Sequence, residues 1–187
     1  MNKDNKKKIA IIGAGWFGCH IGHMLNKNNF NVEIFEKEND IFQNASGNNT
    51  NRLHLGFHYP RSYSTRKMSF DGYKKFLSQY PNLSKPLKNN IYVIAKSKLN
   101  KMSPKLYEKA MLKSDLKFSI LDSKKTDLIN IVKTFNTNER GIDHLKAKTF
   151  FKKKLKKNIF FKKDIRSIKK INNKYMIDNK LFDFVIN

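Results

Sequence analysis

The chain has 187 residues, of which 39 are Lys or Arg and 15 are Asp or Glu, and it contains a single cysteine. This length suffices for one well-cored domain, or for one domain and part of another. The lone Cys19 excludes an intramolecular disulfide framework and suits a reducing compartment. No apolar run approaches the roughly 18 residues that a membrane-spanning helix requires.

The formal net charge of +24 raises the question of a nucleic-acid partner. Residues 1–60 carry seven Lys/Arg against five Asp/Glu, residues 61–145 eighteen against seven, and residues 146–187 fourteen against three. The basic excess is therefore spread over the later chain. The sequence has no zinc-finger spacing and no RNA-binding motif with interleaved aromatic residues. We interpret the lysines as a solvated surface, which predicts only nonspecific, salt-sensitive attraction to polyanions.

The N-terminal residues 2–8 form a polar, basic lead-in that we expect to be frayed. Three lysines at 6–8 precede a short apolar stretch, as they do in a secretory signal. That stretch is too short for a signal and runs directly into a glycine turn. We therefore expect a cytoplasmic protein.

The apolar stretch opens a strand–turn–helix pattern. A strand is predicted at 8–12, followed by a G-x-G-x-x-G turn and a helix at about 15–27. Gly13 allows the tight turn, Gly15 lets the backbone approach a pyrophosphate, and Gly18 lets the helix pack close to the sheet. The helix N-terminus adds N–H donors and a partial positive charge for phosphates. The pattern predicts a dinucleotide-binding turn.

A second strand is predicted at 31–36 and ends on Glu36. Its carboxylate lies at the sequence distance from the turn at which an acid accepts hydrogen bonds from an adenosine ribose. Gly22, one helical turn beyond Gly18, is placed for close contact between helix and sheet. The alternative is an ordinary βαβ unit whose glycines only relieve crowding. The motif does not separate FAD from NAD, because Glu36 suits the ribose of either cofactor.

An irregular segment follows at 39–64, rich in Asn, Ser, Gly and Thr, and such segments beyond a dinucleotide-binding strand are often functional. His54 and His58 offer imidazole acid–base chemistry, and Gly47 and Gly56 allow a backbone to approach a flat ring. The alternative is a polar surface loop. The side chains in this segment with short hydroxyl or amide groups suited to phosphate oxygens are Ser46, Asn49 and Thr50.

Later in the chain the pattern alternates between helices and short strands. Helices are predicted at 65–80, at 104–113 and at 145–157. The second has Ser103 as its N-cap, and the third repeats Ala147, Phe151 and Leu155 on one side. A strand is predicted at 91–95, whereas 117–121 and 128–135 fit either a strand or a short helix. Further strands are predicted at 159–161, 165–171, 175–177 and 181–187.

The glycine turn, Glu36 and residues 46–59 together resemble the D-amino-acid oxidase-like (DAO) family of FAD-dependent oxidoreductases. This family includes glycine oxidase, sarcosine oxidase and L-2-hydroxyglutarate oxidase, and residues 46–59 are most similar to the last of these branches. The resemblance implies FAD as the cofactor, with the 46–59 stretch beneath the flavin and the pyrophosphate. It also implies that the strand around Ile165 contacts adenine through its backbone, and that 183–187 precede an Ala-Thr-Gly turn at the cofactor.

The motif and the resemblance together predict the site residues. The cofactor-binding set is Gly13, Gly15, Trp16, Phe17, Gly18, Glu36, Lys37, Ser46, Asn49, Thr50, Arg52, His54, Gly56 and Ile165. The resemblance places His54 and His58 near the isoalloxazine, either as a base or as packing and hydrogen-bonding partners. His20 and His23 have the spacing of a metal-binding pair, but no third ligand is evident, so no metal site is predicted.

The implied fold class is α/β, a Rossmann-like FAD/NAD(P)-binding fold with part of a mixed α+β substrate domain. The FAD-binding part is expected at 1–65 and again at 141–187, with a partial substrate or cap domain at 66–140. Members of the family are about twice as long, which predicts either a truncated reading frame or a partner chain that supplies the rest. Asn51 and Arg52 replace the Gly-small pair usual in the 2-hydroxyglutarate branch.

A complete enzyme of this kind is expected to oxidise a C–H bond beside an amine or hydroxyl of a small acid-type substrate, with hydride transfer to the flavin. Three alternatives stay open. They are an NAD(P)-dependent enzyme that shares the glycine turn, a noncatalytic cofactor-binding remnant, and a basic nucleic-acid-binding module. We expect a small-molecule substrate and no specific nucleic acid.

Overall fold

The computed structural model describes residues 6–122 and 126–187, which form two compact units. The first unit extends to Thr50 and resumes as His144–Asn187, and the second is Asn51–Asp143. The unit boundaries thus follow Thr50 and precede His144, whereas the sequence places them at 65 and 141. Of the expected frayed lead-in, residues 1–5 lie outside the described residues. None of the helices in the described ranges is both long and apolar enough to cross a bilayer.

A four-stranded parallel sheet forms the centre of the first unit. The strands lie in the order β13 (Phe184–Ile186), β1 (Lys8–Ile12), β2 (Asn31–Phe35) and β9 (Ile159–Phe160). Helix α1 (Trp16–Lys27) connects β1 to β2. The two strands and the helix predicted around the glycine turn are confirmed to within two residues. A parallel sheet with a crossover helix is the Rossmann-like arrangement, so the predicted α/β class is also confirmed.

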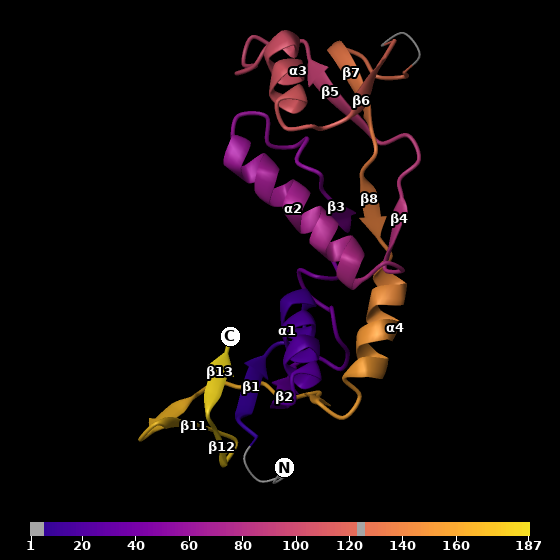
Figure 1. The fold of residues 1–187 in the computed structure, drawn as a ribbon. Helices are drawn as coiled ribbons and strands as arrows, with labels where there is room; N and C mark the ends of the chain where they lie inside the picture. The colour runs from indigo at the N-terminus through magenta and orange to yellow at the C-terminus, as the bar shows by residue number, and fades with distance from the viewer. Residues whose placement is uncertain (1–5, 123–125) are drawn as a thin grey trace. The chain divides into compact units, whose positions relative to one another are not determined.

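Two layers cover the faces of this parallel sheet. Helix α1 packs close to one face, since a Cβ on Gly22 would lie 2.6 Å from Cδ1 of Ile34. On the other face, Ala10 and Phe35 share a core with residues of an antiparallel sheet. That sheet consists of β10 (Lys169–Ile171), β11 (Lys174–Ile177) and β12 (Lys180–Phe182). Figure 1 shows β11 and β12 in yellow beside β1 and β13.

Two strand predictions near the C-terminus are wrong. The apolar run at 181–187 predicts one strand, but Asp183 divides it into β12 of the antiparallel sheet and β13 of the parallel sheet. Asp183 is held at this point by Lys8, whose N–H donates to the Asp183 carboxylate at 2.8 Å and whose carbonyl accepts the Asp183 N–H at 2.8 Å. The strand predicted from 165 begins only at Lys169, and Ile165 lies in an irregular segment.

Within its described residues, the second unit contains two three-stranded antiparallel sheets and two helices. One sheet has the order β3 (Arg52–Leu53), β8 (Arg140–Ile142) and β4 (Ser84–Pro86), and the other has β5 (Ile91–Ala95), β7 (Ile131–Thr137) and β6 (Phe118–Leu121). The helices are α2 (Tyr63–Gln79) and α3 (Pro104–Leu112). The segments 117–121 and 128–135, for which the sequence left strand and short helix open, thus contain the strands β6 and β7. The buried core of this unit is Phe57, Tyr107, Met111, Leu116 and Phe135.

Helix α4 (His144–Lys154) returns the chain to the first unit. Its predicted apolar side is confirmed, because Ala147, Phe151 and the following Leu155 are fully buried. Lysines cover much of the rest of the helix, and two of them pair with an acid. Lys148 and Lys152 lie 2.9 Å and 3.2 Å from the carboxylate oxygens of Asp40. The four-residue repeat therefore marks the side that packs in the core of the first unit.

A pair of matched substitutions tests this packing. Leu155→Ala removes a side chain with no exposed surface and is expected to lower the free energy of unfolding by about 2–5 kcal/mol. Leu145→Ala, at a position 74% exposed at the start of the same helix, is expected to change it by less than about 0.5 kcal/mol. Denaturant unfolding followed by the fluorescence of Trp16, the chain's single tryptophan, measures both. Equal destabilisation by the two changes would contradict this packing.

Candidate cofactor-binding site

A pocket of about 360 Å³ lies at the carboxyl ends of the parallel strands. Ile12 ends β1, Phe35 ends β2, residues 163–165 follow β9, and Asn187 follows β13, and all of them line the pocket. Open parallel sheets bind their ligands at this edge. The rest of the lining is Gly13, Gly15, Glu36, Lys37, Phe42, Gln43, Asn44, Ala45 and Ser46.

Each of the three glycines of the turn is needed for a local reason, either backbone conformation or close contact. Gly13 has a φ of +94°, and its N–H donates to the carbonyl of Phe35 at 2.7 Å. A Cβ on Gly18 would lie 2.0 Å from the Gly13 carbonyl oxygen, and a Cβ on Gly15 would lie 3.1 Å from Oγ of Ser46. The first clash is with backbone that cannot move aside. The turn therefore brings bare backbone to the pocket, as a pyrophosphate-binding turn requires.

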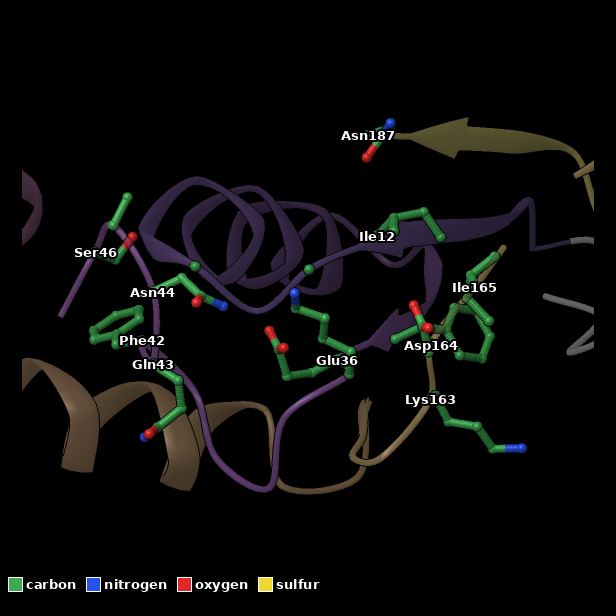
Figure 2. A pocket seen from close by; sticks show the side chains of 15 residues that line it. Ile12, Glu36, Phe42, Gln43, Asn44, Ser46, Lys163, Asp164, Ile165 and Asn187 are labelled. Atoms are coloured by element: carbon green, nitrogen blue, oxygen red, sulfur yellow. The ribbon is translucent and has the colours of Figure 1, made fainter. Parts of the chain in front are cut away.

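Glu36 connects the end of β2 to this turn. Its Oε2 accepts the N–H of Ala14 at 2.6 Å, and its Oε1 accepts the N–H of Glu38 at 3.0 Å. The residue is only 6% exposed. Each carboxylate oxygen has two acceptor sites, so each can accept one more hydrogen bond from the pocket side. Figure 2 shows Glu36 at the centre of the lining, with Ser46 and Asn44 on one side of it and Ile165 on the other.

Ser46 closes the irregular segment onto the start of α1. Its Oγ accepts the backbone N–H of Trp16 at 2.8 Å. The Trp16 ring stacks on Phe42 at a centroid distance of 5.4 Å and meets the edge of Phe151 at 5.5 Å. The Trp16 side chain is therefore half-buried in an aromatic cluster. Phe17, by contrast, is 79% exposed and lines a second hollow of about 300 Å³ together with Gly15, Gly18 and Ser46.

The structure brings together part of the predicted cofactor-binding set. The predicted residues that line the first pocket are Gly13, Gly15, Glu36, Lys37, Ser46 and Ile165. The predicted residues that line the second hollow are Trp16, Phe17 and Gly18, with Gly13, Gly15 and Ser46 shared between the two. Asn49 and Thr50 line neither, and the Asn49 amide donates to the carbonyl of Ala45 at 2.7 Å. The others, Arg52, His54 and Gly56, belong to the second unit, as does the second candidate base, His58.

Two glycines that the sequence associates with a flat ring are required by the chain's own packing. A Cβ on Gly47 would lie 1.9 Å from the carbonyl oxygen of Phe42. Gly56 has a φ of +120°, and a Cβ there would lie 3.0 Å from the carbonyl oxygen of Arg66. Local geometry alone thus accounts for glycine at both positions.

Several lining residues were missed by sequence reasoning, which singled out other members of the same irregular segment. Phe42 has a φ of +60°, a conformation that is uncommon for an aromatic residue and that no local motif announces. Lys163 and Asp164 reach the pocket because the chain leaves β9 irregularly, and Lys163 also pairs with Asp178 at 3.2 Å. The missed residues are Ile12, Phe35, Phe42, Gln43, Asn44, Ala45, Lys163, Asp164 and Asn187.

In the second unit, His54 lies beside a buried acid that the sequence did not indicate. Its Nδ1 is 3.4 Å from Oε2 of Glu139, to which the Tyr92 hydroxyl donates at 2.8 Å. The N–H of Leu55 donates to the other oxygen of Glu139 at 2.7 Å. Burial favours the neutral acid, but the hydrogen bonds from His54, Leu55 and Tyr92 outweigh it and hold the pKa of Glu139 below its usual value.

The described residues contain no cluster of ligands of the kind that binds metal ions in proteins. Among residues 6–122 and 126–187, no three His, Cys, Asp or Glu side chains gather closely enough to bind a metal ion. His23, one member of the pair with metal-like spacing, meets the edge of the Phe150 ring at 5.4 Å. That contact is one of aromatic packing.

The parallel sheet, the glycine turn and the acid at the end of β2 define a dinucleotide-binding unit of Rossmann-like class. Residues 8–130 match the model of the FAD dependent oxidoreductase family, DAO. The chain therefore belongs to this family, and the resemblance seen in its sequence is confirmed. FAD is the cofactor of the family.

Two curated relatives bear the same cofactor in their names. The chain is 34% identical to FAD-dependent monooxygenase FPY4 of Fusarium mangiferae, over 97% of this chain and 49% of the relative. It is 46% identical over 76 residues to FAD-dependent monooxygenase kojA of Aspergillus flavus, which is 41% of this chain and 18% of the relative. The chain thus spans about half the length of FPY4.

Solved structures show the same fold at low sequence identity. The FAD-bound L-alpha-glycerophosphate oxidase of Mycoplasma pneumoniae aligns with a TM-score of 0.74 and 17% identity, over 97% of this chain and 52% of that one. Glycine oxidase of Bacillus cereus aligns with a TM-score of 0.65 and 16% identity, over 96% and 54%. At these identities the likeness shows the fold alone.

The thiol of Cys19 gives a test of how closed the turn is. The side chain is fully buried, and its Sγ lies 3.4 Å from the Ala14 carbonyl. Burial, with a smaller contribution from the charge of Glu36, raises the pKa of Cys19 to about 12. At pH 8 only roughly one thiol in ten thousand is then ionised, and the thiolate is the reactive form.

We therefore expect iodoacetamide to leave the native chain unlabelled at pH 8 and to label it fully after unfolding in denaturant. Because Cys19 is the single cysteine, mass spectrometry of the intact chain reads the result directly. Labelling of the native chain at a rate close to that of the unfolded chain would show that the turn is open.

Proposed function

We propose that this chain forms the FAD-binding half of an oxidoreductase that oxidises a C–H bond beside an amine or hydroxyl of a small acid-type substrate. One observation carries the proposal. The carboxylate of Glu36 meets the glycine turn, at 2.6 Å from the Ala14 nitrogen, on the carboxyl edge of the parallel sheet. Because the chain spans about half of FPY4, the proposal assigns the rest of the catalytic apparatus to further sequence or to a partner chain.

The residues present fit FAD at three points. The backbone from Gly13 to Gly18 has no space for a Cβ at its tightest contact and would hold the pyrophosphate. The N–H groups in the first turn of α1 have no intrahelical acceptors and suit an anion. Glu36 would bind the ribose, and the backbone at Ile165 would bind the adenine. Lys37 lines the same pocket.

The remaining predicted residues are assigned to the flavin side. Bound FAD would supply the acceptor for the hydride. Within this proposal His54 or His58 takes the proton from the substrate amine or hydroxyl, a transfer that leaves a C=N or C=O bond when the hydride departs. The residues assigned to the flavin side are Asn49, Thr50, Arg52, His54, Gly56 and His58.

The names of related proteins guide the choice of substrates. Solved structures of the same fold are named for glycine, for L-proline and for L-alpha-glycerophosphate, compounds that carry an amine or a hydroxyl. FPY4 and kojA are named monooxygenases, so molecular oxygen belongs among the electron acceptors to be tested. A panel of amino acids, 2-hydroxy acids and glycerol phosphate covers the class.

Purification of the chain tests the proposal and its alternatives together. We expect a yellow protein that releases FAD on denaturation and whose flavin absorbance bleaches anaerobically with a member of the panel. Binding of NAD(P) in place of flavin would indicate a nicotinamide enzyme, and flavin that no substrate bleaches would indicate a noncatalytic remnant. Nucleic-acid binding that persists above about 0.2 M salt and survives Gly15→Trp would indicate a nucleic-acid-binding module.

A matched pair of acids, Glu36 directly after β2 and Glu33 within it, tests the ribose contact. Glu36→Gln removes the charge from the pocket and is expected to weaken FAD binding about tenfold or more, since hydrogen bonds to charged groups contribute about 1.5–3 kcal/mol. Glu33→Gln makes the same change three residues earlier, at a residue that pairs with Lys180 at 2.8 Å and lies outside the lining of the first pocket. It should leave binding unchanged. Titration of FAD fluorescence measures both, and equal affinities would place the ribose elsewhere.

A further inference from the structure

Glu139 is a buried acid to which the proposed function gives no role. It lies between β7 and β8, and its side chain is 0% exposed. An unpaired carboxylate in such a place would cost several kcal/mol, so a buried acid is retained only where donors surround it. The N–H of Leu55 and the hydroxyl of Tyr92 donate to it at 2.7 Å and 2.8 Å, and Nδ1 of His54 lies 3.4 Å from the same carboxylate.

The contacts around Nδ1 of His54 determine which of its two ring nitrogens carries the proton. Oε2 of Glu139 and the hydroxyl oxygen of Tyr92 each lie 3.4 Å from Nδ1. An ionised carboxylate only accepts hydrogen bonds. The Tyr92 proton is already donated to Glu139 at 2.8 Å, so its oxygen also faces Nδ1 as an acceptor. Both neighbours therefore require a proton on Nδ1.

Arg52 is a further neighbour of Tyr92. Burial and Glu139 raise the pKa of the Tyr92 hydroxyl, and the guanidinium of Arg52 acts on that hydroxyl in the opposite direction, so Arg52 belongs to the same group of side chains. The ring of His58 lies nearby, with its centroid 5.8 Å from that of His54 and its plane tilted by 32°. The charged and titratable groups that surround His54 in the second unit are thus Arg52, His58, Tyr92 and Glu139.

We propose that Glu139 is the positioning residue of His54, which it holds in the Nδ1–H tautomer so that Nε2 is the ring nitrogen left to accept a proton. The His54 side chain is 33% exposed, in contrast to Glu139. The catalytic meaning of this tautomer rests on the proposed function, in which His54 takes the proton of the substrate amine or hydroxyl. The tautomer itself does not depend on flavin or on substrate.

The tautomer can be measured in the chain alone. Long-range proton–nitrogen correlation spectra of the ¹⁵N-histidine-labelled chain, recorded at about pH 8.5 where imidazoles are mostly neutral, distinguish a protonated from an unprotonated ring nitrogen. His54→Gln assigns the signal, and the other histidines serve as internal references. We expect His54 to show a protonated Nδ1 and an unprotonated Nε2. A protonated Nε2 in the unsubstituted chain would overturn the proposal, whatever any variant does.

Substitution of the acid supplies the second arm. In Glu139→Gln the amide oxygen can still accept the Leu55 N–H, but the amide NH₂ then faces Nδ1 as a donor. We expect His54 to change to the Nε2–H tautomer in this variant. Glu108→Gln, at an acid of α3 in the same unit that pairs with Lys133, should leave the tautomer unchanged. A folded Glu139→Gln chain that keeps the Nδ1–H form would also overturn the proposal.

Tyr92→Phe separates the acid from the hydroxyl. It removes one acceptor beside Nδ1 and leaves Glu139 in place, so the Nδ1–H tautomer should persist. Loss of that tautomer in Tyr92→Phe alone would assign the positioning to the tyrosine. Failure of FAD to bind, with the expected tautomers observed, would refute the proposed function and leave the role of Glu139 intact.

Discussion

The hydrogen bond from the Ala14 N–H to the Glu36 carboxylate is the interaction on which the first unit's site depends. It joins the end of β1 to the end of β2 across 22 residues of sequence, beside a second bond from the Gly13 N–H to the Phe35 carbonyl. The turn that carries both bonds needs glycine at position 18, since a Cβ there would lie 2.0 Å from the Gly13 carbonyl oxygen. The same bond also keeps a charged acid at the pocket, because an acid buried to 6% exposure needs fixed donors.

The pocket needs both segments of the first unit. Ser46 and Phe42 from the earlier segment close on Trp16, and Phe151 of α4 completes that aromatic cluster from the later segment. The floor at 163–165 and the edge at Asn187 also come from the later segment. A chain that ended before His144 would therefore keep the glycine turn and lose several walls of the pocket. The six residues of the glycine turn therefore cannot by themselves predict the binding site, because much of its wall comes from segments distant in sequence.

Sequence periodicity was sufficient to predict an element that buries a single side. The four-residue repeat of α4 and the small residues of α1 each record a single buried side, so both helices could be predicted. Residues 181–186 are apolar on either side of Asp183, so the sequence shows no break. The chain changes sheets where the carboxylate and the N–H of Asp183 form hydrogen bonds with the backbone of Lys8. The strands β3, β4 and β8 have two or three residues each, too few for a period to appear. Phe42 and Glu139 owe their places to contacts distant in sequence, which no local pattern records.

Glu36 and Glu139 show two ways in which a protein keeps an acid out of water. The donors to Glu36 are backbone N–H groups of Ala14 and Glu38, which cannot turn away, so its carboxylate is a rigid acceptor for a neutral hydroxyl. The donors to Glu139 include two side chains, Tyr92 and His54. A backbone N–H has only one protonation state, so the carboxylate that it binds does not change it. An imidazole can carry its proton on either nitrogen, and a carboxylate partner fixes both the ring orientation and the tautomer. In the roles proposed for them, the same residue type would bind the ribose in the first unit and position an acid–base group in the second.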